Sequence, residues 1–400
     1  MNRYNLVFVF LMVLAQSGLV AQNGAPKKCL TDQLHANLRQ QYPDGVPGRI
    51  EARPLSSLKD SYDWTYVVPV VVHIMHNNGV LHNVSDLEVN SQIDVLNEDF
   101  GRYGAGANTD PDGSNAGIRF CLASIDPNGN PTSGINYVQY SGTVNVNPLV
   151  DDTIMKNLIQ WDPERYLNIW VVQSISNGQI QGYSYFPEEA AGTIYDGYVV
   201  DYRFFGRTGF GAVAEGRTGT HEVGHYLSLL HPWGLEEHAC RLEDDGCADT
   251  PYVGDEYFSN APSCAQPATC NGVTVRQVQN YMDYSDDQCM NLFTSCQTQK
   301  MRNAILAYRY KLVSSENLVA TGCKAALDSV PSAEVVHVFP NPANDIIMVY
   351  ADVAEPGNAD VELYDYAGRL VYKKVDAGIG RGALAIDLSK ENMGVYHLIV

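Results

Sequence analysis

The stretch that most restricts how this chain can fold is residues 221–231, His-Glu-Val-Gly-His-Tyr-Leu-Ser-Leu-Leu-His. His221 and His225 lie four residues apart, so on a helix they share one face and can bind one metal ion. Glu222 follows the first histidine, in a position to act on a metal-bound water. Two histidines at this spacing also occur by chance on surface helices, so the pair alone leaves that alternative open.

A third histidine narrows the interpretation. His231 lies six residues after His225, and a straight helix would point it away from the metal. The chain must therefore turn sharply near Ser228. With that turn, three neutral imidazoles bind zinc and leave the fourth position for water, which is the arrangement of a catalytic zinc site. An aminopeptidase-like site would use a glutamate as third ligand, but Glu236 and Glu237 lie too close, in an irregular stretch.

A second motif, Asn-Tyr-Met-Asp-Tyr at residues 280–284, follows downstream. Together with residues 221–231 it resembles the pappalysin family of metzincin metallopeptidases, in its bacterial, cytophagalysin-like branch. The likeness covers roughly residues 65–312. Metzincins usually have glycine at the position of Ser228, and serine adopts a left-handed backbone at a cost of about 1 kcal/mol. Shorter stretches carry the same resemblance: Trp161-Asp-Pro163, Tyr166-Leu-Asn-Ile-Trp170 and Asp249-Thr-Pro251.

The resemblance implies a secreted zinc endopeptidase that hydrolyses peptide bonds of protein or peptide substrates. Glu222 would act as general base and then as general acid. Met282 would form the tight turn beneath the zinc. Tyr284 would hydrogen-bond to the oxyanion, although a core aromatic is the alternative for this residue. A zinc-binding extracellular adhesin or binding module without activity is the alternative function, and the intact Glu222 argues against it. Relatives often cleave before basic residues.

Composition excludes some partners. The 400 residues suggest two or three domains, and 45% apolar with 18% charged residues is typical of globular domains. The net charge of −20 argues against nucleic acid or an anionic membrane as a partner. The same charge is compatible with cationic substrates and with calcium.

The N-terminus indicates export. Residues 1–22 have the pattern of a signal peptide, with Arg3 followed by an apolar run that is too short to span a bilayer. We therefore expect a secreted protein with no membrane span. Residues 23–54 are interpreted as a pro-segment, with a helix over residues 32–41 and a basic cleavage candidate at Arg49-Ile50; a disordered leader is the alternative.

Export makes the nine cysteines candidates for disulfides, and the odd number leaves at least one thiol unpaired. The resemblance suggests the pairs Cys247–Cys270, Cys264–Cys289 and Cys296–Cys323, and leaves Cys121 and Cys240 open. Cys29 stands alone in the predicted pro-segment. Its thiolate could bind the open zinc position as a zymogen switch, or it could pair with Cys121 or another odd thiol.

An acidic, cysteine-rich stretch follows His231, over residues 232–279. The resemblance implies bound calcium there, and oxygen ligands are available. A solvated acidic loop is the alternative. The candidate calcium ligands are Asp244, Asp245, Asp249 and Thr250.

Hydrophobic patterning predicts an α+β fold, with a twisted mixed sheet, backing helices and the active-site helix, over a metzincin-like catalytic domain at residues 55–323. The family resemblance implies that residues 197–201 pair with extended substrate by strand addition. His73, His76 and His82 are interpreted as structural or exposed. Strands are predicted at 66–75, 118–123, 135–140, 166–172 and 196–205, and helices from Ser85, at 152–161 and from Thr294 to about Leu312.

Residues 324–335 read as a linker, and residues 336–400 as a small β-sandwich. Pro340-Asn-Pro-Ala-Asn-Asp345 and Tyr364-Asp-Tyr-Ala-Gly-Arg369 resemble the type A sorting domain of the type IX secretion system. That system's export machinery would be a partner. Relatives continue past the position of Val400, so this domain reads as incomplete. A generic adhesive β-domain is the alternative.

Overall fold

The structure is a computed structural model of the chain. It describes residues 27–54, 65–77, 84–140, 145–207, 214–235, 240, 244–257, 259, 263–270, 272, 275–324, 335–339, 346–352, 359–365, 369–377, 384–390 and 396–399. The predicted signal peptide, most of the predicted linker and His82 lie outside these residues.

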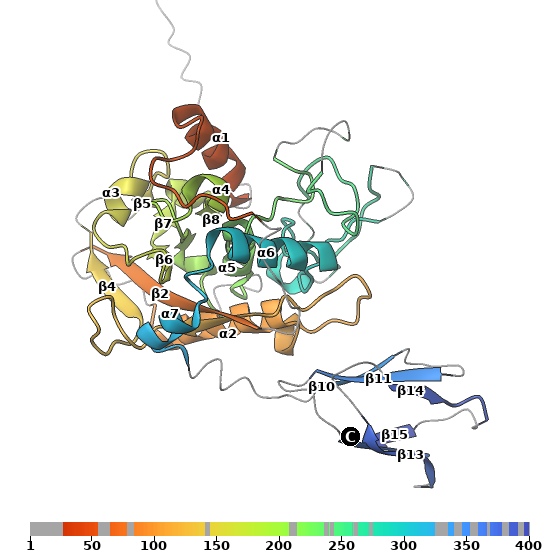
Figure 1. Ribbon diagram of the computed structural model, residues 1–400. Helices are drawn as coiled ribbons and strands as arrows, with labels where there is room; N and C mark the ends of the chain where they lie inside the picture. Colours follow the sequence, from red (N-terminus) through yellow and green to blue (C-terminus); the bar gives the residue numbers. More distant parts are fainter. Residues whose placement is uncertain are drawn as a thin grey trace, which may run out of the picture.

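A nine-stranded mixed sheet forms the centre of the main body (Figure 1). Its longest strand is β2, Tyr66–His76, whose continuous apolar run is buried. β3 and β4 both pair parallel with β2, one after the other, and Pro69 stays in register with Cys121. The other strands of this sheet are β1 Lys27–Cys29, β3 Ile118–Leu122, β4 Ile135–Gln139, β5 Asn145–Val146, β6 Leu167–Val172, β7 Ser174–Ile175, β8 Ile180–Ser184 and β9 Tyr198–Asp201.

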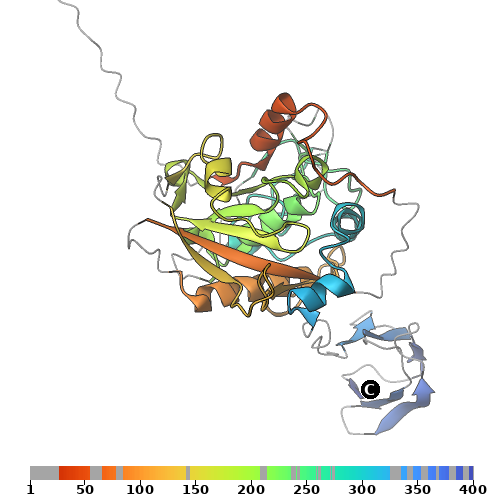
Figure 2. The ribbon, with the colours of Figure 1, turned by 60° about the vertical axis from the view of Figure 1, so that its left-hand side comes forward.

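Alternation along β6 separates two apolar cores, because successive side chains of a strand point to opposite faces. Leu167, Ile169 and Val171 join one core, and Trp170 and Val172 join the other. The first core also holds side chains of α2, α5 and α6, whereas the second holds side chains of α1, α3 and α4. Figures 1 and 2 show α1 and α2 on opposite sides of the sheet. The helices are α1 Thr31–Gln41, α2 Asp86–Gly101, α3 Asp152–Lys156, α4 Pro187–Ala190, α5 Arg217–Tyr226, α6 Ser295–Tyr308 and α7 Ser315–Ala320.

Capping boxes mark the starts of the two helices predicted from Ser85 and from Thr294. Ser85 and Glu88 cap the start of α2, and Thr294 and Gln297 cap α6. Each satisfies backbone N–H groups that the first helical turn leaves without partners. Both helices therefore begin where the sequence predicts.

The helix predicted at 152–161 is wrong in length, because α3 ends at Lys156. Asn168 of β6 explains the early end: its side chain accepts a hydrogen bond from Trp161 N at 2.8 Å and donates one to Trp161 O at 2.9 Å. These contacts hold Trp161 against the sheet and away from helical geometry. The strand predicted at 196–205 is also shorter, since a 3₁₀ turn at Tyr202–Phe204 follows β9.

The prediction that residues 197–201 pair with substrate is wrong. β9 is an interior strand with β6 on one side and β8 on the other. The strand that receives an added chain is β8, which pairs in parallel with β1 of the N-terminus. The short strands β7 and β8, between β6 and β9, have no clear alternation of apolar and polar residues. The strand edge that receives the N-terminus could therefore not be located from the sequence.

The N-terminal segment, residues 27–54, is ordered against the sheet. β1 supplies a strand to β8, and Leu34 and Leu38 of α1 are buried in the second core. A disordered leader is therefore excluded for these residues, and the predicted helix is confirmed.

The C-terminal part forms two separate three-stranded antiparallel sheets, in the orders β10-β11-β14 and β13-β12-β15. This agrees with the predicted small β-domain and completes the predicted α+β class. Among the residues that the structure describes, no helix has the length and apolar character needed to cross a membrane. The strands are β10 Val335–Phe339, β11 Ile346–Asp352, β12 Ala359–Asp365, β13 Leu370–Ala377, β14 Leu384–Asp387 and β15 Tyr396–Ile399.

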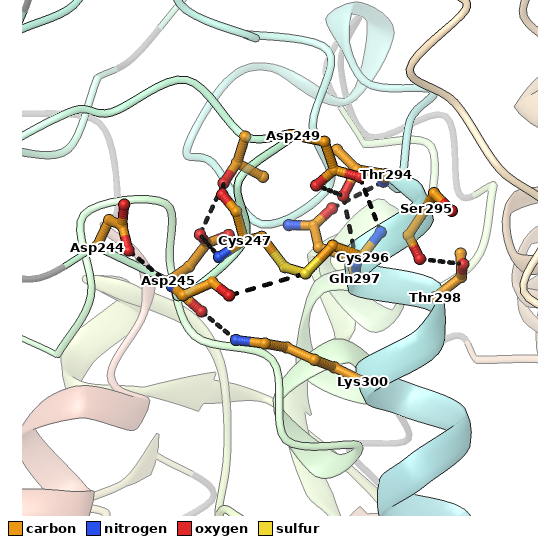
Figure 3. Close-up of a disulfide and its surroundings, with 12 residues drawn as sticks. Asp244, Asp245, Cys247, Asp249, Thr294, Ser295, Cys296, Gln297, Thr298 and Lys300 are labelled. Atoms are coloured by element: carbon orange, nitrogen blue, oxygen red, sulfur yellow. Dashed lines mark hydrogen bonds between the residues drawn. A yellow bond between two sulfur atoms is a disulfide. The ribbon is translucent and has the colours of Figure 1, made fainter.

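Four disulfides join eight of the nine cysteines, and Cys29 is free. The predicted pair Cys264–Cys289 is confirmed. The predicted pairs Cys247–Cys270 and Cys296–Cys323 are wrong. Asp249 explains the first error, because its carboxylate accepts from Cys296 N at 2.8 Å and so brings Cys247 to the start of α6 (Figure 3). The observed pairs are Cys121–Cys323, Cys240–Cys270, Cys247–Cys296 and Cys264–Cys289.

Candidate active site

Three histidines meet at the end of α5, as their spacing predicts. His221 and His225 lie one helical turn apart, and the chain leaves the helix after Tyr226. Ser228 then adopts φ 70°, the left-handed conformation that the predicted turn requires. Its hydroxyl donates to the Glu188 carboxylate, which holds the serine in this strained conformation. The turn brings His231 back to the other two.

The ring nitrogens of this histidine cluster (His221, His225 and His231) converge on one point. The three Nε2 atoms lie 3.1–3.2 Å from one another. On the far side of the rings, His221 Nδ1 donates to Tyr281 O and His225 Nδ1 donates to Leu229 O, each at 2.7 Å. Carbonyl oxygens only accept, so both Nδ1 atoms carry the proton and both Nε2 atoms present lone pairs.

Burial keeps the rings of His221 and His225 neutral. All three side chains are fully buried. Desolvation lowers the pKa of His225 to about 3 and that of His221 well below its ordinary value, and the neighbouring histidines lower both further. Neutral imidazoles with converging lone pairs repel one another unless a cation lies between them. The cluster therefore fits a metal ion such as zinc.

Glu222 lies beside the cluster and is also fully buried. Desolvation raises its pKa to about 8, an effect that hydrogen bonds from Cys29 and Thr31 partly offset. Gly182 of β8 leaves room for it, since a Cβ there would lie 3.0 Å from Glu222 Cγ. A carboxyl group with this pKa can both accept and release a proton near neutral pH.

The turn at residues 280–284 lies under the cluster. A Cβ on Gly224 of α5 would lie 2.3 Å from Met282 Sδ, so the helix and the turn approach as closely as a glycine allows. The Tyr281 hydroxyl donates to Asp99 Oδ1 at 2.8 Å, and Thr220 donates to Asp99 Oδ2 at 2.7 Å. Asp99 of α2 thus fixes the turn and the helix relative to each other.

Tyr284 points toward the cluster. Its ring packs edge-on against His231, with centroids 5.1 Å apart. Its hydroxyl donates to the backbone oxygen of Cys29 at 3.1 Å. Tyr284 is therefore a neighbour of the histidine cluster, and it also contacts a backbone carbonyl of the docked N-terminal segment.

The N-terminal segment closes the site. Cys29 is fully buried, and its Sγ forms a group with the three histidines in which all ligand atoms lie within 4.8 Å of one another. Its thiol also lies 3.5 Å from Glu222 Oε2, and Thr31 donates to the same oxygen at 3.3 Å. Asp32 accepts from His231 Nδ1 at 2.7 Å. A pairing of Cys29 with Cys121 is excluded, because Cys121 is bonded to Cys323.

Sequence reasoning missed one pair next to the site. Lys28 Nζ lies 3.0 Å from Asp287 Oδ1, and the two side chains are only 3% and 5% exposed. Asp287 Oδ2 also accepts from Glu215 N and Arg217 N, at the start of α5. Lys28 and Asp287 belong to no common sequence motif. The only sequence signal for this ion pair is that Asp287 lies three residues after the 280–284 turn.

The candidate calcium ligands have other partners (Figure 3). Asp249 accepts from Thr294 and Cys296 and so caps α6, while Thr250 donates to Asp245 at 2.7 Å. All the candidates are described residues, and the four form no metal-ligating group of their own; Asp249 is grouped only with Cys247 and Cys296, whose sulfurs are joined in a disulfide. Calcium here stays a prediction.

Two of the three histidines set aside as structural or exposed are described. His73 is buried between Asn168, whose Oδ1 is 2.9 Å from Nε2, and Asn136, whose Nδ2 is 3.3 Å from Nδ1. His76 ends β2, away from the cluster. Neither belongs to the histidine cluster.

Comparison with known proteins agrees with this geometry. The sequence model of the family described as pregnancy-associated plasma protein-A matches residues 149–306. Mature mirolysin of Tannerella forsythia, solved in complex with a cleaved peptide, is 38% identical with a TM-score of 0.58, covering 66% of this chain and 99% of that one. The chain belongs to the pappalysin family. The resemblance predicted from its motifs is confirmed.

Other pappalysin relatives agree. An extracellular metalloprotease of Arthroderma benhamiae is 28% identical over 258 residues, which cover 60% of this chain and 78% of the relative. A promirolysin mutant of T. forsythia is 39% identical with a TM-score of 0.56, covering 62% of this chain and 84% of that one. The secretion system C-terminal sorting domain matches residues 337–400. This pappalysin is therefore a secreted, extracellular metalloprotease.

Proposed function

We propose that this pappalysin is a zinc-dependent endopeptidase with His221, His225 and His231 as metal ligands. The observation that carries the proposal is the convergence of three Nε2 atoms on one point, with the Nδ1 protons of His221 and His225 fixed by backbone carbonyls. When bound, zinc would lower the pKa of a water molecule to about 7 and polarise the scissile carbonyl.

Glu222 would supply the proton transfers. It would accept a proton from the attacking water and return it to the leaving amine. Gly182 would keep the carboxylate free to move between the two partners.

Tyr284 would stabilise the substrate oxygen that becomes negative. Its hydroxyl already donates to a backbone oxygen, that of Cys29, at 3.1 Å. A substrate carbonyl at the same place would receive the same hydrogen bond, which strengthens as charge develops on the oxygen.

Residues 27–54 would be a pro-segment that keeps the enzyme latent. The Cys29 thiolate would occupy the fourth metal position, and Thr31 would hold Glu222. β1 blocks β8, so substrate and the segment cannot bind together. Cleavage near Arg49-Ile50 would leave the segment with no covalent tie, since Cys29 forms no disulfide.

A preference for basic residues follows from Lys28. Its buried ammonium group contacts Ser285 O, Asp287 Oδ1 and Met290 Sδ, a set of contacts called here the Asp287 pocket, and Lys28 directly precedes Cys29. A substrate lysine or arginine would replace it once the segment leaves, because a buried carboxylate needs a cationic partner. This agrees with cleavage before basic residues, as the family resemblance implies.

A Glu222→Gln variant tests the proposal. It should bind one zinc per chain, measured by atomic emission, yet hydrolyse casein about 10²–10⁴-fold more slowly. Chelator should abolish activity of the parent enzyme, and added zinc should restore it. Glu316→Gln, at an exposed position in α7, is the matched control and should have parent activity. Full activity in Glu222→Gln would contradict the base assignment. If the zinc-loaded parent enzyme hydrolyses no substrate, the alternative function, a zinc-binding extracellular adhesin without activity, would be favoured.

A further inference from the structure

The surface around α3 carries large apolar side chains in contact with solvent. The α3 patch, defined here as Leu149, Val150, Ile154 and Leu158, has side chains that are 58%, 60%, 54% and 52% exposed. Ile154 lies in α3, and Leu149, Val150 and Leu158 lie in the turns that flank this helix. Contiguous exposed apolar side chains of this size mark interaction surfaces more often than inert ones.

A groove joins this patch to the N-terminal segment. Its volume is about 180 Å³, and two patch residues, Leu149 and Val150, line it. One side of the groove is formed by α1, and the other by residues next to α3 and β8. The lining residues besides Leu149 and Val150 are Leu34, Asn37, Leu38 and Gln41 of α1, and Pro148, Asp152, Thr153, Tyr185 and Tyr195 on the opposite side. The groove is therefore open next to a helix that would leave with the N-terminal segment.

The packing of α1 shows which kind of side chain the surface beneath it can bind. Leu34 and Leu38 are 2% and 5% exposed, and they share the second core with Met155, Tyr183 and Tyr185. When α1 leaves, the apolar surface that these two leucines cover becomes accessible. Burying one leucine side chain contributes about 1.5–3 kcal/mol, so an apolar replacement is favoured over water.

The wall facing α1 is held in place without it. Asp152 accepts from Tyr183 at 2.8 Å and from Tyr185 at 3.0 Å, and forms a buried ion pair with Lys156 at 3.1 Å. The polar ends of both tyrosines are thus satisfied inside the protein. Tyr185, which lines the groove, can therefore offer its ring surface to a ligand, and an apolar side chain fits against that ring better than a charged one.

The groove lies within reach of the histidine cluster. Thr31, at the start of α1, contacts Glu222, and Leu34 and Leu38 follow three and seven residues later. At 1.5 Å per helical residue, these positions are about 4.5 and 10.5 Å further along the axis. An extended peptide covers the longer distance with about three residues. Lys28 precedes Cys29 and α1 follows it, so the Asp287 pocket and the groove lie on opposite sides of the cluster.

We propose that, once the N-terminal segment has left, the side of the groove that remains, with the surface that Leu34 and Leu38 covered, and the α3 patch bind apolar side chains of a protein substrate. These side chains would lie about three or four residues from the scissile bond, on the side away from the Asp287 pocket. The proposal rests on the proteolytic function proposed above. The enzyme would then select extended protein chains that combine a basic residue at the cut with leucine-like residues further along. Short peptides that end before the groove would gain nothing from it.

The experiment uses the processed enzyme and two substrates, casein and a short fluorogenic peptide with a basic residue at the scissile bond and two residues on the groove side. The variants are Leu149→Asp and Ile154→Asp, singly and together. Leu87→Asp is the matched control, because Leu87 is 79% exposed at the start of α2, outside both the patch and the groove. The double variant should lose about 10-fold in kcat/KM on casein, the value for about 1.4 kcal/mol of lost apolar contact, and change less than about 2-fold on the peptide.

Several results would overturn the proposal. Casein hydrolysis equal to that of Leu87→Asp would show that the patch contributes no binding. A parallel loss on both substrates would place the effect at the catalytic centre. Sedimentation that shows a dimer of the parent, dissociated by Ile154→Asp, would assign the patch to a second copy of the chain. Peptide hydrolysis by the parent, and its loss in Glu222→Gln, tests the proteolytic function separately.

Discussion

Replacing Lys28 with methionine tests how the N-terminal segment is held. Lys28 and Asp287 form an ion pair with side chains 3% and 5% exposed. Removing one member of a buried pair costs about 3–5 kcal/mol, because the other charge stays buried. Asp287 keeps its hydrogen bonds from Glu215 N and Arg217 N, so we expect the lower value, about 3 kcal/mol. This corresponds to a roughly 100-fold larger population of the undocked segment.

Hydrogen–deuterium exchange over residues 27–41 measures that population, because the amides of β1 and α1 exchange when the segment opens. A Glu222→Gln background prevents cleavage during the measurement. Lys27→Met is the matched control: Lys27 also forms an ion pair, with Glu256 at 3.0 Å, but its side chain is 45% exposed. Exposed pairs contribute at most about 1 kcal/mol, so exchange should rise by less than about 5-fold. If Lys28→Met exchanges no faster than Lys27→Met, the reasoning from burial is refuted.

Two further predictions concern latency and pH. Cys29→Ala should hydrolyse peptide substrate before processing and digest itself, because water can then enter the fourth ligand position; a purified variant as inactive as its parent would contradict the switch. Burial lowers the pKa of His73 to about 4, so below about pH 6.5 the unfolded chain takes up a proton that the folded protein excludes. The free energy of unfolding should therefore fall by about 2–3 kcal/mol between pH 7 and pH 4.5, a loss absent from His73→Gln. Urea midpoints at both pH values check this, and equal pH dependence in the two proteins would disprove it.

Features set by neighbours in sequence could be predicted. The spacing of the histidines required a turn at Ser228, and φ 70° is found there. Both capping boxes lie within four residues and mark the starts of α2 and α6. The apolar run of β2 was long enough to identify a buried strand without knowledge of its partners.

Features set by distant partners could not be predicted. Lys28 and Asp287 are 259 positions apart, and neither lies in a motif. The early end of α3 depends on Asn168, whose side chain binds the backbone of Trp161. The pairing of Cys121 with Cys323 depends on where the chain returns to β3 after α7, which spacing alone does not determine. Likewise, only the pairing with β1 of the N-terminal segment identifies β8 as the strand that receives an added strand.

The Cys121–Cys323 bond spans 202 positions and encloses α5, the histidine cluster and the 280–284 turn within one covalent loop. A secreted protease is exposed to other proteases and to its own copies. A single nick between residues 122 and 322 leaves both pieces joined through this bond, so the ligand set stays on one molecule. A nick near Arg49 has the opposite result, since residues 27–48 lie outside every disulfide and can diffuse away. A single cut within the disulfide loop therefore leaves the zinc ligands on one molecule. A single cut near Arg49 instead releases the N-terminal segment irreversibly and opens the active site.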